Sequence, residues 1–463
     1  MVGLILALLV GFAALPAWAE SKSVTVSMVS ANSIDKELPF VVLTGGAWRP
    51  EPGAEYVKIH VFPDGEPVLS GIEVESCRTA LEKLHVYVNY DEAVLPSGGE
   101  PDGDSRYYYL HESHQTWRQA FDKPTRVRSL TFNFEKNADL CIAKIRLLSR
   151  NGSQLEVETP RVVGGTVRAT STLDPAPSYD VMNLFDSRFE YAWASNKRAT
   201  GMDLAFNFTQ EETVEKILIW NGYQRSDVHC QSNSRVKTLR VTGDGGYEAT
   251  VSVADRMGSQ ILDLPKVFRG KSLTLSVVDA YRGKTYEDLV ISELRFYDGK
   301  RWFLLNPVAS LHVVVDRNRA EFEKAGLPHV LNKKLEEDYD NGWDLRLRAD
   351  GSLYIQGSER VKLKKANMKF VSGLGNYEVL SSDREKGIKL RIFGFLRESF
   401  ELVEFDCNGC GRDCNTSKTD PKVRERIFQQ FVSLKTLDKE RIRLSNESPV
   451  KKLKFTDIEL YRF

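Results

Sequence analysis

Asn183-Leu184-Phe185-Asp186 opens the stretch that decides the fold of this chain. The stretch continues through Ala192-Trp193 and Asn221-Gly222-Tyr223-Gln224-Arg225, and it closes with Asp288-Leu289-Val290-Ile291-Ser292-Glu293-Leu294. Between these segments, apolar and polar residues alternate, as at Met202, Leu204 and Phe206. Alternation with a period of two is typical of strands with one buried face. The stretch therefore predicts a β-sandwich with turns between short strands.

An earlier part of the chain repeats this pattern. Phe40 matches Phe185 and Trp48 matches Trp193, an offset of 145 residues. Later the offset becomes 149, because Leu140 matches Leu289. A change of four residues in a loop accounts for the shift. The sequence therefore predicts two sandwiches in tandem, although the alternative remains that all antiparallel strands look alike.

Together these segments resemble the discoidin-type (coagulation-factor C-type) galactose-binding-like domain. The resemblance is closest to the NADase-type glycan-binding domain of bacterial exported proteins, and it covers residues 161–303. The copy at about residues 38–150 keeps the core pattern and lacks the polar signature, so it is degenerate. The resemblance implies jelly-roll sandwiches that bind carbohydrate through loops at one end of the sheets.

We expect five segments in the chain. They are a signal peptide at 1–19, a linker at 20–37, the degenerate sandwich at 38–160, the glycan-binding sandwich at 161–303 and an accessory domain at 304–463. The sequence of the accessory domain predicts mostly strands, with one or two helices at residues 316–335 and 421–434. It resembles no family that we recognise. The fold class is thus all-β.

The N-terminus predicts export. The apolar run Leu4–Leu15 ends at Pro16, and Ala17-Trp18-Ala19 offers small residues for cleavage before Glu20. We expect secretion, or a periplasmic or cell-envelope location, and no transmembrane segment. Lys plus Arg and Asp plus Glu number 64 each, so no net charge favours nucleic acid as a partner.

Export makes disulfides the expected state of the cysteines. Cys77 would end one central strand and Cys141 would lie in the last strand of the first sandwich, so they are the first expected pair. Cys230 would then join one of Cys407, Cys410 and Cys414. The spacing of the last three also resembles half of a zinc site, but no fourth ligand follows.

Sugar recognition needs planar hydrogen-bonding groups and an aromatic face. The segment after the apolar strand Val214–Trp220 supplies both, and so does the loop near residue 281. The candidate ligand-binding residues are Asn221, Tyr223, Arg225, His229, Asn233, Arg235, Tyr281 and Tyr286. The resemblance implies that Asn221, Gly222, Tyr223, Asn233 and Arg235 are signature positions of the family. The alternative is that Asn221, Gly222, Asn233 and Arg235 brace the loop.

The resemblance also implies a structural calcium ion near Asp186 and Glu293. Calcium takes six to eight oxygen ligands, which loop carbonyls would complete. The family continues with Asp-Gly at this point, whereas this chain has Asp186-Ser187. The alternative is that Asp186 caps a turn and Glu293 pairs with a nearby arginine.

The sequence contains no nucleophile elbow, zinc-protease motif or phosphate-binding loop. We therefore expect a non-enzymatic exported protein that binds carbohydrate through the second sandwich, with cell-surface or envelope components as further partners. One alternative is an extracellular enzyme whose catalytic site lies in residues 304–463 and is targeted by the sandwich. Another is an envelope adhesin that binds protein.

Overall fold

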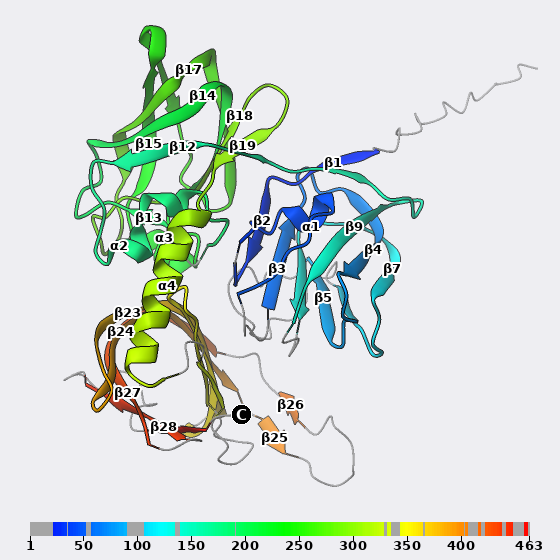
Figure 1. Cartoon of the computed structure of the whole chain (residues 1–463), viewed down its shortest axis with the longest axis vertical. Coiled ribbons are helices and arrows are strands. Elements are labelled where there is room, and N and C mark those ends of the chain that lie inside the picture. The colour runs from blue at the N-terminus through cyan, green and yellow to red at the C-terminus, as the bar shows by residue number, and fades with distance from the viewer. Residues whose placement is uncertain are drawn as a thin grey trace, which may run out of the picture.

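A computed structural model describes most of the chain. It describes residues 22–34, 36–51, 57–89, 106–134, 139–189, 191–327, 331–334, 343–363, 366–401, 403–405, 415–417, 422–437, 441–447 and 458–461. Over these residues the chain forms two β-sandwiches and a β-barrel, with a long helix between the second sandwich and the barrel (Figure 1). The all-β class and the tandem sandwiches are therefore confirmed.

The first sandwich packs two sheets, with strand orders β2-β3-β8-β5-β6 and β7-β4-β9, and β1 pairs in parallel with β10. Its elements are β1 (Ser23–Thr25), β2 (Met28–Ala31), α1 (Val41–Thr44), β3 (Val57–Phe62), β4 (Val68–Ser76), β5 (Leu84–Val88), β6 (Arg106–Tyr109), β7 (Thr116–Arg126), β8 (Leu130–Phe134), β9 (Ile142–Ser149) and β10 (Glu156–Glu158). β2 lies in the expected linker and pairs with β3, so the first sheet begins before residue 38.

The second sandwich is built around two long strands, β14 and β17, which pair with each other and bend between the two layers. Its elements are β11 (Arg161–Val163), β12 (Gly165–Ala169), α2 (Ala176–Tyr179), η1 (Val181–Leu184), β13 (Trp193–Ala194), β14 (Met202–Asn221), α3 (Asp227–Ser232), β15 (Arg235–Gly243), η2 (Asp244–Gly246), β16 (Tyr247–Ser252), β17 (Ser259–Tyr281), β18 (Val290–Tyr297) and β19 (Trp302–Leu305).

The predicted repeat appears as equivalent backbone pairing in the two sandwiches. Trp48 forms a bridge with Ile142 in the first, and Trp193 pairs with Ile291 in the second. Both tryptophan side chains are fully buried. The two pairs differ by the two offsets of the repeat, so the matched positions have the same place in the fold.

The predicted Cys77–Cys141 disulfide is present, and the Cα atoms of the two cysteines lie 5.4 Å apart. It joins the end of β4 to the start of β9. The disulfide expected from Cys230 is not formed, because Cys230 is a free thiol buried in α3, and burial raises the pKa of that thiol to about 11. Cys407, Cys410 and Cys414 lie outside the described residues.

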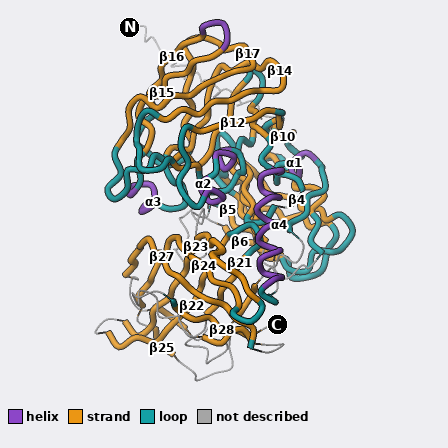
Figure 2. Tube along the Cα trace, turned by 60° about the vertical axis from the view of Figure 1, so that its left-hand side comes forward, coloured by secondary structure: helices purple, strands orange, loops and turns teal. Residues whose placement is uncertain are grey.

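The C-terminal region contains a helix and a closed barrel (Figure 2). The elements are α4 (Val308–Lys324), the barrel strands β20 (Leu331–Lys334), β21 (Trp343–Leu347), β22 (Ser352–Leu363), β23 (Ala366–Asp383), β24 (Gly387–Glu401), β27 (Lys422–Thr436), β28 (Arg441–Asn446) and β29 (Ile458–Tyr461), and a separate hairpin of β25 (Val403–Phe405) and β26 (Asn415–Ser417).

Both helices expected in this region need correction. The helix expected at 316–335 begins earlier, at Val308, and ends at Lys324, before Gly326 turns the chain. The helix expected at 421–434 is wrong, because these residues form β27. Alternate residues of β27 are buried in the barrel core: Phe428, Gln430, Val432 and Leu434. Because Gln430 is polar, the hydrophobicity of the sequence does not show this period of two.

No helix within the described ranges combines the length and the apolar character that crossing a bilayer requires. The predicted signal peptide lies in residues 1–21, outside the described part of the chain.

Candidate functional site

The predicted ligand loop connects β14 to β15 at one end of the second sandwich and includes the short helix α3. Most of the residues predicted to bind ligand are buried there. The buried ones are Asn221, Tyr223, Arg225, His229, Asn233 and Arg235. Tyr281 is half-buried, whereas Tyr286 is 41% exposed. The structure therefore brings the predicted residues together but leaves one of them well exposed.

Asn221 and Arg235 hold the backbone of this loop. The side-chain oxygen of Asn221 accepts a hydrogen bond from the backbone nitrogen of Val236 at 2.9 Å, and its amide donates to the Val236 oxygen at 2.8 Å. Arg235 donates to the carbonyls of Cys230 and Asn233 at 2.9 and 2.7 Å. Asn221 and Arg235 therefore brace the loop through its backbone, which is the alternative that the sequence left open.

Arg235 also forms an ion pair with Asp255 at 2.6 Å, which keeps its guanidinium charge paired. Gly222 lies under this side chain with a φ of +80°. A Cβ atom at Gly222 would come within 2.8 Å of Cγ of Arg235. The Asn-Gly signature thus serves both the left-handed turn and the close approach of Arg235.

Tyr223, Arg225 and His229 form a stack that faces the barrel. The guanidinium carbon of Arg225 lies 4.6 Å from the centre of the Tyr223 ring, and the Tyr223 and His229 rings are 5.0 Å apart. Burial, followed by the charge of Arg225, lowers the pKa of His229 well below its ordinary value. His229 is therefore neutral at pH 7.

The barrel covers this stack. Arg225 donates a hydrogen bond to the side-chain oxygen of Asn376 in β23, and His229 lies 5.9 Å from the Phe395 ring in β24. Nearby, Tyr179 stacks on Phe393 at 6.4 Å. The C-terminal barrel therefore covers part of the loop end where the sequence predicts a ligand.

A second part of the loop end stays open. Tyr286 is exposed there, and Lys284 donates a hydrogen bond to Gln231 at 2.7 Å. The exposed Arg282 lies 3.8 Å from Glu287. We call Gln231, Arg282, Lys284 and Tyr286 the Tyr286 rim. The aromatic and basic residues near position 281 marked this loop in the sequence, but Gln231 carried no such signal.

Tyr281 supports the rim from below. Its hydroxyl donates to the Val253 carbonyl at 3.1 Å, and the ammonium of Lys237 lies 6.0 Å from its ring. The two tyrosines thus have different surroundings, with Tyr281 packed against the sandwich and Tyr286 in solvent. The prediction that each binds ligand remains a prediction.

The proposed calcium position holds two carboxylates and an arginine. Glu293 accepts hydrogen bonds from the backbone nitrogen of Arg188 at 2.8 Å and from Arg295 at 2.8 Å. Asp186 accepts from the same Arg188 nitrogen at 2.9 Å. Arg295 also donates to Ser187 Oγ at 2.8 Å and to the Leu184 carbonyl at 3.4 Å.

This donor set does not fit calcium. The buried guanidinium of Arg295 already lies where the carboxylate, hydroxyl and carbonyl oxygens converge. Burial, followed by the charge of Glu293, raises the pKa of Asp186 well above its ordinary value, which disfavours the charged form that a calcium ion would need. Across the described residues, no group of three or more His, Cys, Asp and Glu side chains could hold a metal ion.

A second buried ionic cluster lies where both sandwiches meet the barrel. Arg188 pairs with Asp350 at 3.0 Å, and Arg319 of α4 pairs with Glu51 of the first sandwich at 3.0 Å. Arg348 donates to the Asn32 carbonyl at 2.6 Å. Burial, followed by the charge of Asp350, raises the pKa of Glu51 to about 7. The junction thus contains a carboxyl that titrates near neutral pH.

We expect this junction to lose stability as the pH rises from 5 to 8. The Glu51 carboxyl has a pKa of about 7 when folded, against an ordinary value of 4.5. Its contribution is therefore complete below pH 4.5 and is lost as the pH rises through 7, by roughly 3 kcal/mol. Thermal unfolding from pH 5 to 8 should show a shallower decline for Glu51→Gln than for the wild type. Equal slopes for the two proteins would contradict the assignment.

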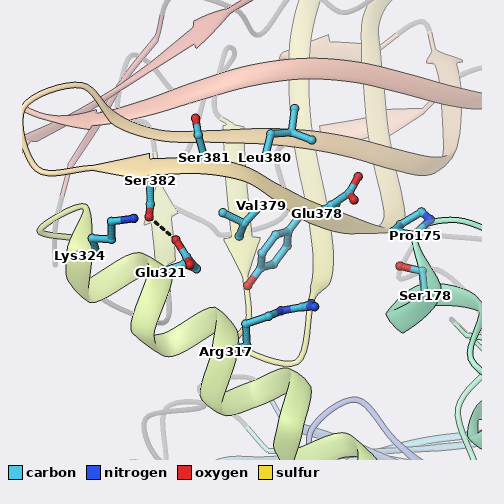
Figure 3. Close-up of a pocket in the computed structure, with 11 residues that line it drawn as sticks. Pro175, Ser178, Arg317, Glu321, Lys324, Glu378, Val379, Leu380, Ser381 and Ser382 are labelled. Atoms are coloured by element: carbon cyan, nitrogen blue, oxygen red, sulfur yellow. Dashed lines mark hydrogen bonds between the residues drawn. The ribbon is translucent and has the colours of Figure 1, made fainter.

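Two cavities lie along α4, between the second sandwich and the barrel. One, of about 360 Å³, is lined by Pro175, Ser178, Arg317, Glu321, Lys324, Tyr377, Glu378, Val379, Leu380, Ser381 and Ser382 (Figure 3). The other, of about 270 Å³, is lined by Asp180, Met182, Asn183, Tyr191, Pro307, Ser310, Leu311, Val313, Val314, Arg317 and Asp350. Arg317 borders both, and we call the two together the α4 groove. No motif in the sequence marked it.

Comparison with known proteins supports the family resemblance predicted for the second sandwich. Residues 161–297 match the family model described as NAD glycohydrolase translocation F5/8 type C domain. The family resemblance is therefore confirmed for this sandwich. A search of curated proteins found no match to the chain.

Several solved structures are similar to parts of the chain. The CBM32-1 and CBM32-2 domains of Clostridium perfringens ZmpB, in complex with GalNAc, are 10% identical over 59% of this chain and 90% of that chain, with a TM-score of 0.23. The family 32 CBM of C. perfringens NanJ, in complex with galactose, is 17% identical over 28% of this chain and 90% of that one, with a TM-score of 0.22.

A longer ZmpB structure, which adds the M60 catalytic domain, is 11% identical over 88% of this chain and 52% of that chain, with a TM-score of 0.24. At these identities and scores, the ligands of those proteins do not carry over to this chain.

Proposed function

We propose that this protein, whose second sandwich is an F5/8 type C domain of the NAD glycohydrolase translocation family, is an exported, non-enzymatic carbohydrate-binding protein. The observation that carries the proposal is the Tyr286 rim, the open part of the loop end of that sandwich. Export rests on the predicted signal peptide and is tested by N-terminal sequencing of the mature protein, which should begin at Glu20.

The chemistry of the rim suits a sugar. An exposed tyrosine ring offers a flat apolar face for the ring carbons, while amide, ammonium and guanidinium groups beside it hydrogen-bond to hydroxyls. Tyr286 supplies the ring, and Gln231, Lys284 and Arg282 supply the polar groups. An exposed aromatic side chain on a loop is also a common place for recognition.

The buried signature residues support the rim from beneath. The Tyr286 backbone nitrogen donates to the Ser232 carbonyl at 2.8 Å, and the Ser234 hydroxyl donates to the Tyr286 carbonyl at 3.4 Å. Gly283 packs so closely that a Cβ atom there would lie 2.4 Å from the Ser232 oxygen. The segment that Asn233 and Arg235 brace is therefore the platform on which the rim stands, and a rigid platform lowers the cost of binding.

Replacing Tyr286 with alanine should weaken glycan binding about tenfold or more, because the stacking face is lost. The melting temperature should stay near that of the wild type, since this side chain is 41% exposed. A glycan array probed with the full chain identifies the ligand, and titration calorimetry with that glycan gives the affinity.

The matched control is Tyr107→Ala, which removes a tyrosine that is 49% exposed in β6 of the first sandwich. It should leave the affinity unchanged. The proposal fails if the folded wild-type chain binds nothing on a broad array. It also fails if Tyr286→Ala binds as tightly as the wild type.

A further inference from the structure

The α4 groove has the position and the size that are typical of a small-molecule site. It lies where the second sandwich, α4 and the barrel meet, and such sites are common at domain interfaces. Its larger cavity, of about 360 Å³, falls within the range of roughly 300–1,000 Å³ that ligand pockets occupy. The smaller cavity adjoins it at Arg317.

Arg317 is one of two cations, with Lys324, that line the larger cavity. It is exposed on α4, and it makes no ion pair with any carboxylate of the described residues. In Figure 3 its side chain extends from α4 into the space beneath the strand that carries Glu378 and Val379. A guanidinium presents a fork of donors that matches a carboxylate in a bidentate fashion.

Four acidic residues line the groove, and two of them pair with arginines outside its lining. Glu378 pairs with Arg391 at 2.7 Å, and Glu321 accepts a hydrogen bond from Ser382. Asp350 pairs with Arg188 at 3.0 Å. Glu378 and Asp350 are therefore paired with other arginines, whereas Glu321 keeps its negative charge about one helical turn from Arg317.

The remaining lining favours a ligand with hydroxyl groups. Ser178 of α2 and Ser382 of β23 line the larger cavity from opposite sides, and the Ser382 hydroxyl donates to Glu321 (Figure 3). Val379 adds an apolar surface beside them, and the buried Tyr377 also contributes to the lining. A carboxylate anchor, flanking hydroxyl partners and an apolar wall together match a sugar ring that carries an acid group.

We propose that the α4 groove binds a small acidic saccharide, with the ligand carboxylate on Arg317. This site is separate from the Tyr286 rim and does not depend on the function proposed for it. Because α2, α4 and β23 all line the groove, a bound ligand contacts the second sandwich and the barrel at the same time. Binding should therefore also raise the melting temperature.

Titration calorimetry of the full chain tests the proposal with three probes: glucuronate, glucose and inorganic phosphate. Glucuronate should bind at least about tenfold more tightly than glucose, because only the acid offers Arg317 a carboxylate, and more tightly than phosphate, which has no apolar ring face to pack on Val379. Arg317→Gln should weaken glucuronate binding about tenfold or more, while Arg317→Lys should retain part of it.

Arg384→Gln is the control, since it removes the same charge from an exposed position in the turn between β23 and β24, outside the lining of the groove. It should bind glucuronate as the wild type does. The Arg317 variants should keep the wild-type melting temperature in the absence of ligand, because the side chain is exposed.

Three results would overturn the proposal: no glucuronate binding by the wild type, equal binding by Arg317→Gln, or phosphate binding as tight as that of glucuronate. The last would identify a bare oxyanion site. Tyr286→Ala separates the two proposals, because it should leave glucuronate binding in the groove intact. A failure here leaves the array result for the rim unaffected.

Discussion

Replacing Glu293 with alanine should lower the free energy of unfolding by about 3–5 kcal/mol. Glu293 and Arg295 are both fully buried and pair at 2.8 Å. Removing the carboxylate leaves the guanidinium of Arg295 in the interior without its counterion, and an uncompensated buried charge is costly. Chemical denaturation followed by tryptophan fluorescence measures the loss.

The same variant separates an ion pair from a calcium site. The control is Glu248→Ala, which removes an exposed glutamate from β16 of the same sandwich and should change stability by less than about 0.5 kcal/mol. Neither calcium nor a chelator should shift the melting temperature of the wild type. Stabilisation by calcium that Glu293→Ala abolishes would show that the carboxylates hold a metal after all.

Replacing Cys77 and Cys141 together with serine should cost the first sandwich about 4 kcal/mol. The disulfide closes a loop with a sequence separation of 64, and the loop-closure entropy of the unfolded chain gives this size. The bond joins strands of one sheet, because β4 pairs with β9. Loss of the disulfide should therefore destabilise the core of the first sandwich and not merely a chain terminus.

The effect should be confined to one unfolding step, since the three domains need not unfold together. Reducing agent should destabilise the wild type to the level of the double variant and leave the double variant unchanged. Cys230→Ala is the matched control, because it removes a thiol that is not in a disulfide. If reductant had no effect on the wild type, the disulfide would not contribute to stability.

The tandem fold was predictable because its determinants are local and repeated. Trp48 and Trp193 lie at equivalent places in two alternating patterns, and alternation reports burial on one face of a strand. The Cys77–Cys141 pair followed from the same alignment, because the alignment placed Cys77 at the end of a central strand and Cys141 in the last strand. These strands, β4 and β9, are neighbours in one sheet. These predictions needed only the periodicity within each sandwich.

The surroundings of the predicted site depended on a different domain. The sequence grouped Tyr223, Arg225 and His229 correctly in one loop, but Asn376 and Phe395, which contact Arg225 and His229, lie more than a hundred residues away in the barrel. No local pattern records which surface a neighbouring domain covers. The sequence also did not predict strand β27 of the barrel. There Gln430 is buried and Phe431 is exposed, the reverse of the usual pattern in a strand.

The expected calcium position holds the guanidinium of an arginine. Asp186 and Glu293 come together as the family resemblance implied, and their neighbour decides what they do. Arg295 was visible in the sequence, two positions after Glu293, and both side chains lie on the same side of β18. An arginine two positions from an expected metal ligand on a strand indicates that its guanidinium can take the place of the metal ion.

Helix α4 sets the angle between the domains as well as the distance. Within one turn, Arg319 contacts Glu51 in the first sandwich, Asn318 donates to the Ala349 carbonyl at 2.7 Å, and Glu321 bonds Ser382 in the barrel. Each residue of a helix advances by about 100°. Inserting a single residue ahead of Asn318 would therefore turn Arg319 away from Glu51 and break the ion pair between α4 and the first sandwich.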